Sequence, residues 1–184
     1  MNCLRLWLSI SVVLLSLLCA GTRSTAASRA TRAVPQKSAP CATLKHRQFD
    51  FWAGDWDAFD VDRPSIKVAR LRVKIILDGC VLLEDYQGKD GSEGESFTIY
   101  DAARGVWHQT WVTNRGKLLV IEGNIHNGEM VLSGGDHLAG GKSQRVRGTW
   151  RPVNDGVRET AVTSTDDGKT WKPWFDLLFR PHHL

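Results

Sequence analysis

The sequence lacks the motifs by which many enzymes are recognised. It contains no G-x-S-x-G motif and no glycine-rich phosphate loop, and its cysteines and histidines do not show the spacing of a zinc site. The adjacent pair His182 and His183 stands near the end of the sequence, where a solvated tail is expected rather than a metal site. These absences favour a protein without a resident metal or cofactor.

Acidic residues are absent from the first part of the sequence. Residues 1–47 contain seven basic residues and no Asp or Glu, so all 20 acidic residues share the stretch 48–184 with 17 of the 24 basic ones. The formal net charge of +4 therefore comes from the N-terminal part, and the remainder is mildly acidic. Because no dense basic patch is present, a groove that follows phosphates is disfavoured, and we expect no nucleic-acid partner.

Long apolar runs are also scarce. The one clear run, from Leu4 to Leu18, is short for a membrane span and precedes a polar stretch, which is typical of a secretory signal peptide. We predict a signal peptide over residues 1–26, with Ala20 as a second cleavage position and lipidation at Cys19 as an alternative. The mature protein is then periplasmic or secreted, without a stable membrane anchor.

Residues 27–47 are rich in Ala, Ser, Pro and basic residues and have no apolar periodicity. We expect this segment to be a flexible lead-in to one folded domain over residues 48–184. Contact of its basic residues with an acidic surface is the alternative.

Helical periodicity is missing from the rest of the sequence. From Phe49 onward apolar residues repeat with a period of two, and turn signals such as Asn127-Gly128 recur about every 8 to 14 residues. The pattern predicts about ten strands, the first over 49–61, with glycine-rich loops at 87–95 and 134–143. Because an open meander of this length leaves edge strands exposed, the sequence predicts an all-β, antiparallel up-and-down barrel.

Only two cysteines, Cys41 and Cys80, lie outside the predicted signal peptide. In the first hairpin, the start of the first strand lies beside the end of the second, which brings Cys80 close to the stretch that enters the barrel. We predict a disulfide between these cysteines, and two unpaired buried thiols are the alternative.

The first predicted strand carries Gly54-Asp55-Trp56. Gly54 allows close backbone packing, and Trp56 is expected to plug the floor of the barrel. Closure of the barrel places Arg180 beside this strand, where its guanidinium is expected to stack over the face of Trp56. This combination resembles the calycin superfamily of lipocalin-like barrels, although a generic core tryptophan implies the same closure.

A pocket wall is predicted on the strand that contains Trp107, Gln109 and Trp111, because alternate residues of a strand share one face. Two indoles that flank an amide offer a ligand flat apolar surface and one hydrogen-bonding group, and ordinary core packing is the alternative. Glu84 and Tyr86 are expected along the same wall.

Glu84 and Glu122 are the best acid–base candidates, since both lie on predicted strands that can line the lumen opposite Gln109. As partners of Arg72 or Arg147 they would be structural instead.

The segment that contains Ser164, Asp166, Gly168 and Trp171 has the pattern S-x-D-x-G-x-T-W. It is similar to the Asp box of sialidase-type propellers, but a propeller needs several copies and the sequence has one. We expect a structural staple, in which the Ser and Asp side chains bond to the turn, Gly168 has a positive φ and Trp171 covers the turn.

The strings HRQFDFWAGDWD, ILDGCVLLE, VWHQTWV and STDDGKTW, in this order after Cys41, resemble an exported bacterial family known only as a domain of unknown function. The resemblance covers about residues 41–180 and implies a lipocalin-like barrel, but no reaction. Members often have an aromatic and an acid near the positions of Ala161 and Val162, from which this sequence departs.

Three functions remain open from the sequence. The first is a binding module for a small, partly apolar ligand along the wall of Glu84, Tyr86, Trp107, Gln109 and Trp111. The second is a hydrolase or isomerase with Glu84 or Glu122 as the base. The third is an interaction protein whose lumen is filled by its own side chains.

Overall fold

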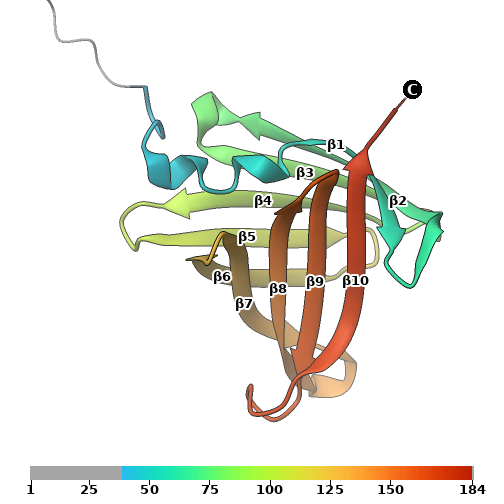
Figure 1. The fold of residues 1–184 in the computed structure, drawn as a ribbon. Helices are drawn as coiled ribbons and strands as arrows, with labels where there is room; N and C mark the ends of the chain where they lie inside the picture. Colours follow the sequence, from blue (N-terminus) through green and yellow to red (C-terminus); the bar gives the residue numbers. More distant parts are fainter. Residues whose placement is uncertain (1–38, 184) are drawn as a thin grey trace, which may run out of the picture. The chain divides into compact units, whose positions relative to one another are not determined.

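Ten antiparallel strands pair in sequence order, and the first also pairs with the last, so that the sheet closes into a barrel (Figure 1). The computed structural model describes residues 39–183; the predicted signal peptide, the question of lipidation at Cys19 and most of the lead-in lie outside these residues. The elements are η1 (Leu44–Arg47), η2 (Asp50–Trp52), β1 (Gly54–Asp60), β2 (Arg63–Ile76), η3 (Leu77–Gly79), β3 (Val81–Gly88), β4 (Glu93–Asp101), β5 (Val106–Thr113), β6 (Leu118–His126), β7 (Glu129–His137), η4 (Ala139–Gly141), β8 (Ser143–Val153), β9 (Gly156–Ser164) and β10 (Lys172–Pro181).

The predicted closed up-and-down barrel is therefore confirmed, in a form consistent with a lipocalin-like fold. Its two glycine-rich loops are shorter than expected, because β3 runs to Gly88 and β7 to His137. The second loop is reduced because the β7–β8 ladder continues to the pair His137 and Ser143. Beside this pair, the buried Asp136 accepts a hydrogen bond from Gln144 (Nε2–Oδ2 2.9 Å).

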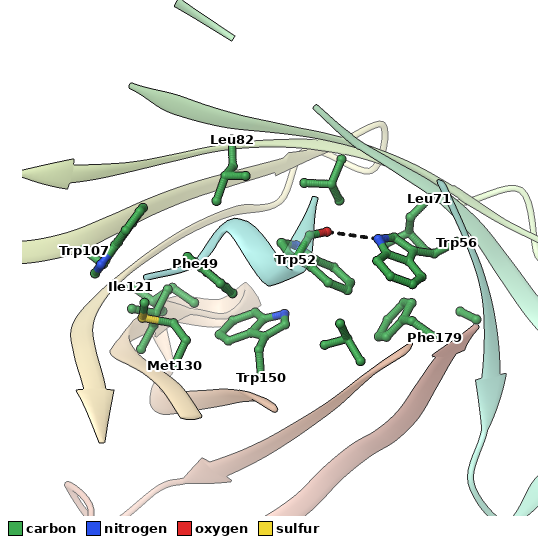
Figure 2. Packing of buried hydrophobic residues seen from close by; sticks show 14 of the residues in the cluster. Phe49, Trp52, Trp56, Leu71, Leu82, Trp107, Ile121, Met130, Trp150 and Phe179 are labelled. Carbon is green, nitrogen blue, oxygen red and sulfur yellow. Dashed lines mark hydrogen bonds between the residues drawn. The ribbon is translucent and has the colours of Figure 1, made fainter. Parts of the chain in front are cut away.

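A plug of two 3₁₀ turns, η1 and η2, closes one end of the barrel. Phe49 and Trp52 are almost fully buried. The ring of Phe49 meets Trp107 of β5 and Trp150 of β8 edge-on, with centroids 5.8 and 5.6 Å apart, and Trp52 meets Phe179 of β10 (Figure 2). Since these partners come from strands on different sides of the barrel, the plug fills the lumen at this end.

The plug begins inside the segment that was expected to be flexible, and it takes residues that were expected to be strand. Leu44–Arg47 forms η1, and β1 starts only at Gly54. The Cys41–Cys80 disulfide predicted from the hairpin is present, with the two Cα atoms 5.0 Å apart. Arg47 also donates a hydrogen bond to the carbonyl of Gly79. Both contacts tie the plug to the turn between β2 and β3.

The seam between β1 and β10 follows the prediction, but the arginine at its end does not. Trp56 points inward, is 8% exposed and donates its Nε1 hydrogen bond to the carbonyl of Trp52 (3.0 Å; Figure 2). Arg180 pairs in register with Asp57, the neighbour of Trp56, and therefore faces outward. Its guanidinium lies over the ring of Phe59 (4.8 Å) instead of Trp56. The predicted stack is wrong because the two side chains are on opposite faces of the sheet.

The close approach predicted at Gly54 is real, since a Cβ atom there would lie 2.4 Å from the Trp56 ring. Trp56 contributes to the closed end, together with the stacked ring of Trp52 (6.2 Å). The stopper is thus shared between the plug and the first strand.

The turn between β9 and β10 is a structural staple, as predicted. The Ser164 hydroxyl accepts a hydrogen bond from the Gly168 amide (2.8 Å), and Asp166 accepts one from the Thr170 amide (2.9 Å). Gly168 has a φ of +87°, and Trp171 donates to its carbonyl (3.0 Å). Within the described range, no helix is long and apolar enough to cross a membrane.

Candidate functional site

Beyond the plug, the lumen contains a cavity of about 720 Å³ that extends to the turns at the opposite end of the barrel. This volume is within the range of small-molecule sites. Its walls are mainly apolar, and the aromatic residues among them are Tyr86, Trp111, Trp150, Trp174, Phe175 and Phe179. The lumen is therefore filled at one end and hollow at the other.

The predicted wall of β5 is placed in two parts. Gln109 and Trp111 line the cavity, as do Glu84 and Tyr86 of β3. Trp107 shares their face but is buried against the plug and does not line the cavity. Strand alternation alone does not separate Trp107 from Trp111, because the difference depends on how far the plug reaches into the lumen.

Glu84 is the first polar anchor in the cavity. Its carboxylate accepts a hydrogen bond from the Ser96 hydroxyl of β4 (2.9 Å), and Gln109 donates to Thr98 (3.1 Å) and more weakly to Ser96 (3.4 Å). Burial raises the pKa of Glu84 to about 7, against the lowering effects of Ser96 and the indole of Trp52. The Glu84 carboxyl is therefore expected to gain or lose its proton near neutral pH.

Neither arginine that was considered as a partner of Glu84 reaches it. Arg72 lies 3.3 Å from Asp55 on the outer face, and Arg147 lies over the Trp171 ring at 4.1 Å. Both arginines belong to the outward row of their strands, whereas Glu84 is inward. A structural ion pair is therefore not what holds this carboxyl in the lumen.

Glu159 of β9 is a second lumenal carboxyl, and our sequence reasoning missed it. It is partly buried and lines the same cavity. Burial raises its pKa well above the usual value, the charge of Glu84 adds to this, and the indole of Trp150 opposes it. The signal was available, because Glu159 lies in the alternating row between Val157 and Ala161, both of which are buried.

The prediction that Glu122 lines the lumen is wrong. The Glu122 side chain faces outward, where Arg104 (Nη2–Oε1 2.8 Å) and His108 (Nδ1–Oε1 2.7 Å) bind its carboxylate. The Arg104 guanidinium, and then His108, lower the pKa of Glu122 to about 2. The reason for the error is register, since Gln109 pairs with Ile121 and shares its face, while Glu122 pairs with His108.

On the outer face, Glu122, His108 and Thr110 form a chain of contacts that resembles a catalytic triad of acid, histidine and hydroxyl. His108 contacts Glu122 through Nδ1 and the Thr110 hydroxyl through Nε2 (2.8 Å). The cluster lies on the outer face of β5 and β6, away from the cavity, and adjacent strand backbone is engaged in the β4–β5 and β5–β6 ladders. This cluster therefore belongs to the outer surface of the barrel and is not part of the lumenal site.

Two buried indole nitrogens lie close to the lumenal carboxyls, that of Trp52 to Glu84 and that of Trp150 to Glu159, without a hydrogen bond of ordinary geometry. Nε1 of Trp150, in a residue that is 3% exposed, and Nε1 of Trp52, in a residue that is 1% exposed, are both buried. Trp150 lines the cavity together with Glu159, so its N–H is a donor placed between this carboxyl and whatever occupies the space.

Metal ligation has no evident site here: among residues 39–183 there is no group of three or more His, Cys, Asp or Glu side chains arranged to hold an ion.

No protein-family model matches the chain, and no curated protein is significantly similar to it. The fold and the cavity are therefore the basis of the functional argument.

Proposed function

We propose that this protein is an exported carrier or sensor that binds a small, partly apolar molecule inside its barrel. The observation that carries the proposal is the aromatic cavity of about 720 Å³, in a barrel whose other end is packed by Phe49 and Trp52. A hollow of this size with a few polar groups on its walls is the usual form of a small-molecule site. The leader pattern and the Cys41–Cys80 disulfide support the exported location.

The proposal is tested with N-phenyl-1-naphthylamine, an uncharged apolar fluorophore that brightens when it leaves water. The wild-type protein is expected to bind it in the micromolar range. Ala161→Phe places a ring in the cavity and is expected to weaken binding at least about tenfold, whereas Val162→Phe, next to it on the outward face, keeps wild-type affinity.

Circular dichroism of both variants checks that the barrel is intact. Failure of the wild-type protein to bind the fluorophore, or equal losses in the two variants, would contradict a lumenal site.

Proton-transfer catalysis, as in a hydrolase or isomerase, is the second candidate, and the pKa of Glu84 near 7 is the observation that favours it. Under this reading the rate of turnover has a pH midpoint near 7. It is lost in Glu84→Gln, and circular dichroism checks that this variant keeps the barrel. Turnover that persists in Glu84→Gln would remove this candidate.

A further inference from the structure

Two carboxyls from different sides of the barrel enter one cavity. Three strands separate β3 from β9 in one direction round the sheet and five in the other, and Glu84 and Glu159 both line the hollow between them. Glu84 is 8% exposed. Buried acids are costly to a fold unless something pairs with them, so their presence on apolar walls calls for an explanation.

Within the described part of the chain, no cation forms an ion pair with either carboxyl. Two cationic side chains do line the cavity, at its mouth, but each is paired elsewhere: Arg115 with Asp90 (3.0 Å) and Lys117 with the buried Asp136. A ligand could therefore supply the positive charge that pairs with Glu84 and Glu159.

The walls around the carboxyls suit an organic cation. The rings of Tyr86 and Trp111 meet edge-on (5.7 Å). The indole of Trp150 lies next to Glu159. Indole and phenol faces attract ammonium groups, most strongly where water is excluded. A hard metal ion needs several oxygen ligands, which these walls do not offer.

The indole of Trp150 adds a polar group beside one of these carboxyls. Its N–H is buried, lines the cavity and acts on Glu159, where it opposes the effect of burial on the pKa of that carboxyl. A hydroxyl or carbonyl on the ligand could share this donor with Glu159, and such a group is compatible with a largely apolar body.

We propose, on the basis of the lumenal function above, that the ligand is a small aromatic or apolar amine whose ammonium group is bound jointly by Glu84 and Glu159. The cavity excludes anions by the same arrangement, because a carboxylate or phosphate would face two acids.

The pH dependence of binding has a defined sign. An ammonium ion binds the charged carboxylate, so binding releases a proton and affinity rises with pH, by up to about tenfold per unit below the carboxyl pKa. The other titratable and charged groups that line the cavity are Asp60, Tyr86, Glu93, Arg115 and Lys117. The two cations are paired to acids, and we expect these groups to shift the midpoint without changing the sign.

The test uses three 4-hydroxyphenyl compounds whose two-carbon side chain ends in an ammonium group (tyramine), a hydroxyl group (tyrosol) or a carboxylate (4-hydroxyphenylacetate). By calorimetry at pH 7.5, tyramine is expected to bind at least about tenfold more tightly than the other two. The double variant Glu84→Gln/Glu159→Gln loses this preference. Glu95→Gln, an exposed acid on β4, retains it. Between pH 5.5 and 8 the affinity for tyramine rises, and the affinity for tyrosol stays level.

Equal affinity for the three molecules, a preference that survives the double variant, or an affinity for tyramine that falls with pH would each overturn the amine proposal. So would failure of tyramine to bind a protein that still binds N-phenyl-1-naphthylamine, and in these cases the lumenal site itself stands. If the fluorophore also fails to bind, the proposed function falls with the inference.

Discussion

At the scale of single residues, Glu84 shows how burial sets both chemistry and stability. The side chain keeps one good hydrogen bond, from Ser96, but it has lost most of its hydration. The folded protein therefore holds the carboxyl proton of Glu84 up to about pH 7, while the unfolded chain loses it near the ordinary glutamate pKa of 4.5. Between these two values the folded state binds more protons, so stability falls as pH rises.

Replacement of Glu84 by Gln tests this linkage. We expect the wild-type free energy of unfolding to decrease between pH 4.5 and 7, with about 3 kcal/mol of the decrease due to Glu84. Glu84→Gln is expected to show a clearly smaller decrease, because Glu159 alone still contributes in the same direction. Urea unfolding at several pH values measures it, with Glu95→Gln as the control. A Glu84→Gln profile parallel to the wild type would contradict the account.

The residue scale also shows where sequence reasoning works. Alternation placed Gln109 and Trp111 on the same, inward face correctly, because the single residue between them, Thr110, points outward. It failed at Glu122, since Leu118 to Ile121 are all apolar and the parity of that strand is ambiguous until its register with β5 is known. Glu159 was within reach of the same rule and was overlooked.

At the scale of elements, the plug is the part of the fold that the sequence describes least well. The alternation of Phe49 and Phe51 indicates a strand, yet Phe51 lies within the 3₁₀ turn η2 and Phe49 directly precedes it, and aromatic rings of this segment fill the end of the barrel. An alternation of apolar residues over so short a segment does not distinguish a strand from a 3₁₀ turn. Here the aromatic rings of the segment pack against several different strands. The disulfide was predictable because it depends only on hairpin geometry.

The Cys41–Cys80 bridge is expected to make the largest single contribution to keeping the plug in place. The cysteines are 39 residues apart, and closing such a loop stabilises a protein by about 4 kcal/mol in the chain-entropy model. Cys41→Ala/Cys80→Ala should therefore unfold at lower urea concentration by a corresponding amount. The reduced wild-type protein should unfold at the same concentration as the variant. A variant as stable as the oxidised wild type would show that the plug holds without the bridge.

At the scale of the whole molecule, closure was predictable and the cavity was not. Ten strands joined by short turns have few alternatives to a barrel, and the pairing of β1 with β10 removes both edges. How much of the lumen is empty depends on where the rings from ten strands and the plug come to lie. Trp107 and Trp111 illustrate this, because the same pattern puts one into the packed end and the other into the hollow.

A crystal structure of the protein grown with tyramine tests the central claim most directly, since it examines the hollow, its carboxyls and its ligand together. We predict one tyramine molecule in the barrel, with its ammonium nitrogen within hydrogen-bond distance of carboxylate oxygens of Glu84 and Glu159 and its ring against Trp150. A lumen closed by inward-turned side chains, or tyramine bound only outside the barrel, would contradict the account.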